Sequence, residues 1–154
     1  MTTIVYDVRA KDQTRRASMR ERWVPRDTLH ATVRGHVSES FEELVVWQRA
    51  MELLVEVYQL ARRLPAYESA DLGSQVRRAA TSIPANIAEG NARAHRREYL
   101  HFLSIARGSA AELATHLEGA RRVGYVSDAD VAHATQLLRS VGELLARVVA
   151  SLSS

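Results

Sequence analysis

Apolar residues recur every three or four positions over four long stretches of the chain, which is the spacing of one face of an α-helix. No stretch of useful length alternates with the period of a β-strand. The loops between the stretches are short, so successive helices should be antiparallel neighbours. The pattern therefore predicts an all-α protein, an antiparallel up-down-up-down four-helix bundle. Its helices are expected at about residues 41–64, 71–90 and 96–123, and from just after residue 127 to about residue 152.

Capping signals support these boundaries. Ser40 and Glu43 form the S-x-x-E sequence of a capping box immediately before the first apolar run. Ser127 has Asp130 three residues later, which predicts a capped start for the fourth helix. Gly124 follows the third apolar run, where a glycine suits the end of a helix.

The first expected helix carries more apolar residues than one core face requires. Two adjacent stripes together cover roughly half of its circumference, whereas a helix packed on one side of a core needs about 100°. The surplus predicts a second partner, either a wrap by the chain's own helices or another subunit. One stripe is Leu44, Trp47, Met51, Leu54, Tyr58 and Ala61, and the other is Val46, Ala50, Leu53, Val57, Leu60 and Leu64.

The first forty residues differ from the rest in pattern and in charge. They show no sustained period and hold eight basic and five acidic residues, which is the whole net charge of +3. We interpret residues 1–40 as a flexible basic tail and residues 41–154 as one bundle domain. Two interpretations of the tail stay open: contact with nucleic acid or a membrane surface, or no specific function, with Met19 as an alternative start.

Composition excludes several classes of function. The chain has no cysteine, which rules out disulfides, thiolate zinc sites and cysteine nucleophiles, and which fits the cytosol. No apolar run approaches the roughly 18 residues of a membrane span. The first ten residues do not form a secretory signal. A cytoplasmic protein without a membrane partner is therefore expected.

The stretch TSIPANIAEG places a proline inside the second expected helix. Pro84 removes one helix hydrogen bond, but the apolar stripe continues on both sides, which favours a bend over a break. Ser82, Asn86 and Glu89 share a face beside that stripe. They are candidates for a hydrogen-bonded polar patch between helices or subunits, for a ligand or partner site, or for catalysis with Glu89 as a base. No nucleophile, histidine or metal cluster nearby supports catalysis, so we favour the first.

Three stretches of the bundle carry a recognisable order of motifs: FEELVVWQRAMELLVEVYQLARRLP, QVRRAATSIPANIAEG and REYLHFLSIARGSAAELATHLEGARRVGY. Over about residues 41–152 the chain closely resembles a bacterial four-helix-bundle family. This family is also known as the 23S ribosomal RNA intervening-sequence protein family. Its relatives include the accessory protein of diversity-generating retroelements.

This resemblance implies a four-helix bundle that assembles as a ring-like homopentamer and has no known catalytic activity. Some family members sit in insertions within ribosomal RNA genes, and the retroelement relatives bind a reverse transcriptase and nucleic acid through basic surfaces. The expected partners are therefore further copies of the chain, and RNA or a nucleic-acid enzyme. The residues of the family motif are expected to be structural: Ser82, Ile83, Pro84, Asn86, Glu89 and Gly90.

Arginines around the second and third helices are the candidate nucleic-acid-binding residues: Arg77, Arg78, Arg93, Arg96 and Arg97. The alternative is a solvated or intersubunit salt-bridge face, since acidic residues lie nearby and no aromatic residue alternates with the arginines to stack bases. Ala94 and His95 stand where the family often has a basic residue and a serine, so the cap of the third helix should be weaker.

Two sequence pairs resemble halves of a di-iron helix motif, Glu98 with His101 and Asp130 with His133. In antiparallel helices they would lie roughly 40 Å apart, so no metal site and no cofactor are expected. No nucleophile elbow, phosphate loop or glycine-rich nucleotide motif occurs either. The sequence thus favours a non-enzymatic homo-oligomeric adaptor that binds RNA or a nucleic-acid enzyme. The alternative is a purely structural oligomer with protein partners only.

Overall fold

A computed structural model of the protein describes residues 40–153. These residues contain four α-helices, two short 3-10 helices and no strand. The proposed tail of residues 1–40 lies outside the described residues, apart from Ser40. The elements are η2 (Phe41–Glu43), α2 (Val45–Ala61), η3 (Ala66–Glu68), α3 (Leu72–Asn91), α4 (Arg96–Arg122) and α5 (Asp128–Ser153).

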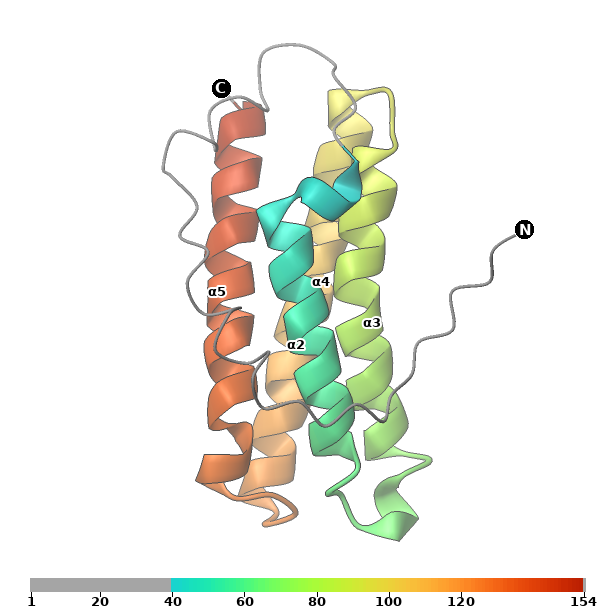
Figure 1. Ribbon diagram of the computed structural model, residues 1–154. Coiled ribbons are helices and arrows are strands. Elements are labelled where there is room, and N and C mark those ends of the chain that lie inside the picture. The colour runs from blue at the N-terminus through green and yellow to red at the C-terminus, as the bar shows by residue number, and fades with distance from the viewer. Residues whose placement is uncertain (1–39, 154) are drawn as a thin grey trace, which may run out of the picture. The chain divides into compact units, whose positions relative to one another are not determined.

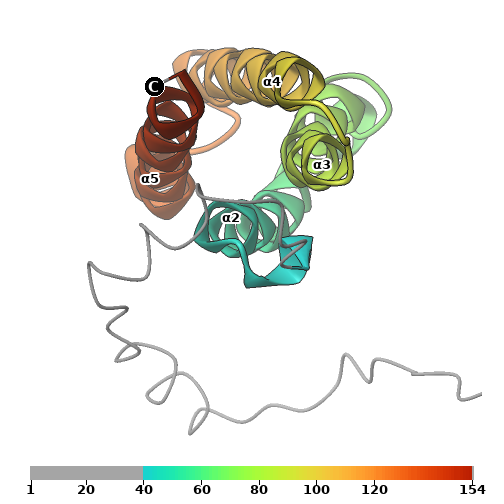
Figure 2. The ribbon, with the colours of Figure 1, turned by 90° about the horizontal axis from the view of Figure 1, so that it is seen from above.

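The four helices run side by side with alternating direction (Figure 1). Viewed along the bundle, they occupy the corners of a square in chain order, so that α5 closes against α2 (Figure 2). The helix pairs in extensive contact are α2 with α3, α3 with α4, α4 with α5, and α2 with α5. The predicted all-α antiparallel four-helix bundle is confirmed.

The two apolar stripes of α2 differ in how deeply they are buried. The stripe that begins at Val46 is fully buried as far as Leu60, and it faces buried residues of the other three helices. The other stripe lies toward the outer side of α3, where the Tyr58 hydroxyl meets Thr81 Oγ1 at 3.4 Å. Tyr58 remains 41% exposed and its neighbour Val55 51% exposed. The described residues therefore cover the surplus apolar arc of α2 only in part.

The two predicted capping boxes have different outcomes. The prediction for Ser40 and Glu43 was wrong, because Leu44 adopts an extended conformation that separates η2 from α2. Ser40 accepts a 3.4 Å hydrogen bond from the backbone N–H of Glu42 and so caps only a single 3-10 turn. At the start of α5 the box forms in full. Ser127 N–H donates to Asp130 Oδ2 at 2.9 Å, and Asp130 N–H donates to Ser127 Oγ at 3.2 Å.

Helix α2 ends three residues before the predicted boundary at Leu64. Its last turn tightens, with the N–H groups of Arg62 and Arg63 donating to carbonyls only three residues back. Pro65 follows, and the residue before a proline is displaced from helical geometry. At the end of α4, Gly124 adopts a φ of +79°, which a glycine tolerates best.

Candidate nucleic-acid interface

Helix α3 passes through Pro84 without interruption, as the continuous apolar stripe predicted. Pro84 is buried, and its missing N–H leaves the Ala80 carbonyl without its usual helix donor. The Thr81 hydroxyl does not compensate there, because it donates to the Arg77 carbonyl at 2.8 Å. The proline is therefore a packing residue of the core that α3 accommodates within one helix.

A chain of hydrogen bonds joins α3 to α4 beside the proline. Asn86 Nδ2 donates to the Ser82 carbonyl at 2.7 Å and to Ser82 Oγ at 3.0 Å. The hydroxyls of Ser82 and Ser109 lie 2.8 Å apart. Ser109 in turn donates to the Ile105 carbonyl at 3.1 Å, so Ser82 is the donor between the two serines. Glu89 does not join this polar patch, because its carboxylate pairs with Arg93.

Gly90 lets α3 and α4 approach closely at one end of the bundle. A Cβ atom at this position would lie 2.7 Å from Tyr99 Cδ2 and 3.0 Å from Phe102 Cβ. Neither distance can be accommodated without a shift of the aromatic side chains or of α4. Burial against this contact raises the pKa of Tyr99, because the phenolate would lose hydration. The motif glycine is thus explained by packing.

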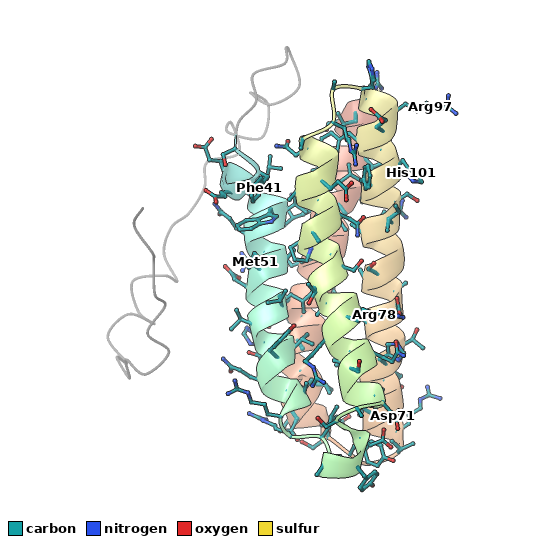
Figure 3. All side chains as sticks on the ribbon, turned by 90° about the vertical axis from the view of Figure 1, so that its right-hand side faces the viewer. Phe41, Met51, Asp71, Arg78, Arg97 and His101 are labelled. Carbon is teal, nitrogen blue, oxygen red and sulfur yellow. The ribbon has the colours of Figure 1, made fainter. Side chains whose placement is uncertain are left out.

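The five candidate arginines do not form one cluster. Arg77 and Arg78 lie near the start of α3, where Arg77 donates to the Ser69 carbonyl at 2.8 Å and Arg78 lies 3.5 Å from Glu112 Oε1. Figure 3 shows Arg78 far along the bundle from Arg97. At 1.5 Å per residue, the distance along α3 from Arg78 to the turn that follows this helix is about 20 Å.

The other three arginines gather where α3 ends and α4 begins, and we call this the basic end of the bundle: Arg93, Arg96 and Arg97. Arg93 pairs with Glu89, and its guanidinium lies 4.7 Å from the centroid of the Phe102 ring. Arg96 and Arg97 are exposed, and neither pairs with an acidic residue within residues 40–153. Their charges are available to a ligand.

The start of α4 adds partial positive charge to the basic end. His95 occupies the N-cap with an extended backbone, and its side chain makes no capping hydrogen bond. A serine at this position would accept a bond from the first turn, so the predicted weak cap is confirmed. Open N–H groups at a helix start, together with the helix dipole, favour a negatively charged ligand.

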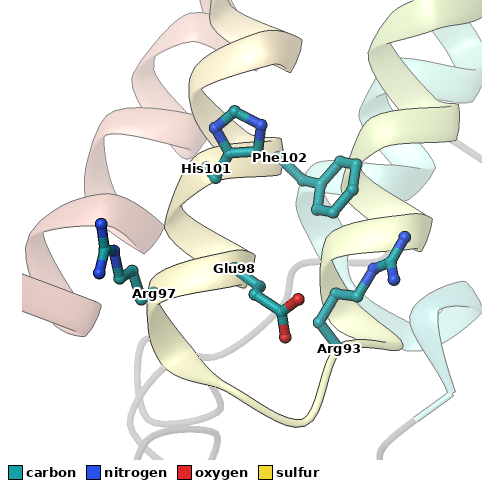
Figure 4. A pocket seen from close by; sticks show the side chains of 5 residues that line it. All are labelled: Arg93, Arg97, Glu98, His101 and Phe102. Carbon is teal, nitrogen blue, oxygen red and sulfur yellow. The ribbon is translucent and has the colours of Figure 1, made fainter.

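A pocket of about 410 Å³ opens at the basic end. Four of its lining residues belong to α4, where His101 lies one helical turn after Arg97 and Phe102 lies one turn after Glu98. The fifth is Arg93, from the loop between α3 and α4. His101 and Phe102 lie on one side of the pocket, Glu98 lies on the other, and the two arginines flank it (Figure 4). No regular alternation of arginines with aromatic residues marks this site in the sequence, but the i, i+4 spacing on one helix was the signal that could have found it.

The two sequence pairs that resemble a di-iron motif lie at opposite ends of the bundle. Glu98 and His101 are at the start of α4, whereas Asp130 pairs with Arg63 and His133 Nδ1 lies 3.1 Å from Glu56 Oε2. Within the part of the chain that the structure describes, no three potential metal ligands come together. None of the helices within residues 40–153 combines the length and the hydrophobicity that a membrane span requires.

The fold and its basic end define a small antiparallel four-helix bundle with an arginine-bearing turn between α3 and α4. Residues 42–147 match the family model of the 23S rRNA-intervening sequence protein. The chain belongs to this family, as the motif order in the sequence indicated.

A solved structure has a similar fold. It is the crystal structure of a protein with unknown function from the S23 ribosomal protein family of Bacteroides thetaiotaomicron. The two chains are 24% identical and superpose with a TM-score of 0.62, over 68% of this chain and 98% of the other. At this identity the likeness supports the fold alone. No curated protein sequence matches the chain.

Proposed function

We propose that this protein is a non-enzymatic homo-oligomeric adaptor that binds RNA through the arginines of its basic end. The observation that carries the proposal is the pair Arg96 and Arg97, exposed on the first turn of α4 without a carboxylate partner in residues 40–153. Guanidinium groups bind phosphate oxygens through paired N–H donors. The family to which the chain belongs carries the name of a ribosomal RNA insertion, which makes RNA the first ligand to test.

The proposal restricts the candidate interface to the basic end. Arg77 and Arg78 are less suited to phosphate, because one is held by a backbone carbonyl and the other lies near Glu112. Arg93 is partly neutralised by Glu89. The electrostatic attraction of the site therefore rests on Arg96, Arg97 and the uncapped start of α4.

Self-association would multiply this weak site. The outer stripe of α2 consists of Trp47, Met51, Leu54, Val55 and Tyr58, none of which is fully buried in a single copy. A second copy that covers this stripe would supply the partner that its surplus apolar residues require. The resemblance to pentameric family members makes five copies the expected number. A ring would then present several basic ends to one RNA, and linked weak contacts raise affinity through effective concentration.

Salt-dependent RNA binding tests the first part of the proposal. Arg96→Ala combined with Arg97→Ala should remove two phosphate contacts per chain. The slope of log affinity against log salt should then fall by about 0.7 per contact for a single strand. The matched control is Arg139→Ala with Arg147→Ala, which removes the same charge from exposed positions on α5. Equal losses in both double variants would refute a specific role for the basic end.

Light scattering of the intact chain tests the second part. Val55→Glu places a charge in the middle of the outer stripe of α2 and should dissociate the oligomer. Ile105→Glu is the matched control, since Ile105 is also a partly exposed apolar residue, but on α4. A monomeric mass for the unsubstituted chain would contradict the assembly.

The alternative function is a structural oligomer with protein partners only. The exposed outer stripe of α2 favours it as much as it favours the adaptor, because that stripe says nothing about RNA. A stable oligomer that binds no RNA at low salt would select this alternative.

A further inference from the structure

The pocket at the basic end has the size of a small-ligand site. Its volume of about 410 Å³ falls within the range of roughly 300–1,000 Å³ that is usual for such sites. Its lining combines two cationic groups, one carboxylate and two aromatic rings (Figure 4). This combination contains the groups that recognise the phosphate, the base edge and the base face of a nucleotide.

Two charges in the pocket have no partner in the described part of the chain. The carboxylate of Glu98 makes no ion pair and no hydrogen bond there, and the guanidinium of Arg97 makes none either. The two residues are adjacent in sequence and therefore project about 100° apart around α4. They do not neutralise each other. The two carboxylate oxygens of Glu98 can therefore accept hydrogen bonds from a ligand, and the guanidinium N–H groups of Arg97 can donate to one. Arg93 differs, because Glu89 and Phe102 already hold it.

The aromatic side of the pocket supplies a stacking surface. The rings of His101 and Phe102 meet edge to face, with centroids 5.6 Å apart and an interplanar angle of 67°. His101 is exposed, whereas Phe102 is half-buried against Gly90 and therefore fixed in place. Because the two rings are steeply inclined and Arg93 lies over Phe102, the exposed His101 ring is the one on which an unpaired base can stack, whatever the identity of that base.

The Glu98 carboxylate discriminates between bases. Guanine presents two adjacent N–H donors, N1–H and the N2 amino group, which match the two oxygens of a carboxylate. Adenine and cytosine present an amino group beside a ring nitrogen that accepts, and uracil presents one N–H between two carbonyls, so each would repel one carboxylate oxygen. These guanine donors are occupied in a base pair, which restricts the site to unpaired strands.

We propose that this pocket binds one unpaired guanine nucleotide. Arg97 contacts its phosphate, the exposed His101 ring stacks on the base, and Glu98 accepts hydrogen bonds from N1–H and N2–H. The inference rests on the proposed RNA binding and adds to it a base preference and a preference for single strands.

The test is a fluorescence-anisotropy titration of the full chain with short oligouridine strands. The strands carry G, A, C or U at one central position, and a DNA version and a duplex version of the G strand are included. The G strand should bind about tenfold more tightly than the U strand, since one bidentate contact of this kind supports such discrimination. Pairing the G strand into a duplex should remove the advantage. Equal binding of the RNA and DNA strands would show that the site reads the base and not the sugar.

Variants separate this inference from the proposed function. Glu98→Gln should reduce the preference for G to within about twofold while binding of the U strand is retained. Glu143→Gln is the matched control, an exposed glutamate on α5 without an ion pair in the described residues, and it should leave the preference intact. His101→Ala should weaken all single strands several-fold without changing their order.

Two results would overturn the guanine inference without refuting the proposed RNA binding. One is salt-dependent binding by the unsubstituted chain that is equal for the four strands. The other is an equal effect of Glu98→Gln and Glu143→Gln on the G preference. Circular dichroism of the variants would exclude a melted start of α4 as the cause. An absence of binding to every strand at low salt would instead refute the proposed function, and the inference with it.

Discussion

At the end of the bundle where α4 finishes, polar side chains are extensively paired, whereas at the basic end aromatic rings provide much of the close packing. Arg121 meets both Glu118 and Asp128 at that first end, which we call the paired end. At the basic end, Tyr99 and Phe102 instead pack against the bare backbone of Gly90, and Arg96 and Arg97 are left unpaired within residues 40–153.

At the paired end, these hydrogen bonds shift the pKa values of Glu118 and Tyr125. Hydrogen bonds from Arg121 and Arg122 lower the pKa of Glu118 to about 2. A 2.9 Å hydrogen bond from Tyr125 to Glu68, with a second interaction from Tyr67, raises the pKa of Tyr125 to about 12. The comparison indicates that charged side chains stabilise the fold through ion pairs at the paired end, whereas Arg96 and Arg97 at the basic end have no acidic partner within residues 40–153.

The largest expected effect concerns the close packing at the basic end. Gly90→Ala should destabilise the bundle by about 1–3 kcal/mol, because the added methyl group overlaps Tyr99. Gly108→Ala, on an exposed part of α4 where a Cβ meets nothing within 4 Å, should instead stabilise it by up to about 1 kcal/mol. Urea unfolding of both variants measures the difference. Effects of the same sign would contradict the role assigned to Gly90.

The next effect concerns the capping box at the paired end. Ser127→Ala removes the acceptor for Asp130 N–H and should cost about 1 kcal/mol. Ser40→Ala removes only a 3.4 Å bond in a 3-10 turn and should cost a few tenths of that. Thermal melting of the two variants side by side tests the contrast. Equal losses would contradict this contrast, because the Ser40 hydroxyl would then stabilise its turn as much as the Ser127 hydroxyl stabilises α5.

A smaller effect should appear with pH. Because the folded pKa of Glu118 is lowered from 4.5 to about 2, its stabilising contribution is fully present above about pH 4.5 and is lost as the pH falls through about 2. Glu118→Gln should therefore lower the melting temperature at neutral pH, and the difference from the unsubstituted chain should shrink across that window. A difference that is constant with pH would exclude the carboxylate as its source.

The smallest effect on stability is expected at the basic end. Arg97→Ala should change the free energy of unfolding by no more than about 0.5 kcal/mol, since no ion pair within residues 40–153 is lost. The same variant should weaken RNA binding clearly. A large loss of stability would show that Arg97 has a structural role, and would weaken the separation of the two ends.

The fold followed from the sequence because helical periodicity is local. The apolar spacing predicted four helices, and Ser127 with Asp130 predicted the start of α5 correctly. The equivalent signal at Ser40 failed, because its motif is also compatible with a single 3-10 turn, and the extended Leu44 then separates that turn from α2. A capping motif indicates which hydrogen bond a side chain can accept, but it does not determine the length of the helix that follows.

The candidate site was only partly visible in the sequence. The sequence grouped five arginines, but the structure brings only Arg93, Arg96 and Arg97 together, because Arg77 and Arg78 lie farther along α3 and face other partners. Ser109 was not foreseen, although it completes the polar contact that Ser82 begins. Its position among the small residues of α4 carries no sign of a partner on another helix.

By itself, the sequence determined that the chain forms four amphipathic helices, that Pro84 stays within one of them, and that α2 has more apolar surface than one core can bury. These properties depend on spacing along a single helix. Only the tertiary structure decided which arginines keep their charge free, why residue 90 has no side chain, and that Arg93 joins the α4 residues of the pocket. Those properties depend on distances between residues from different elements, which are set when the helices pack together.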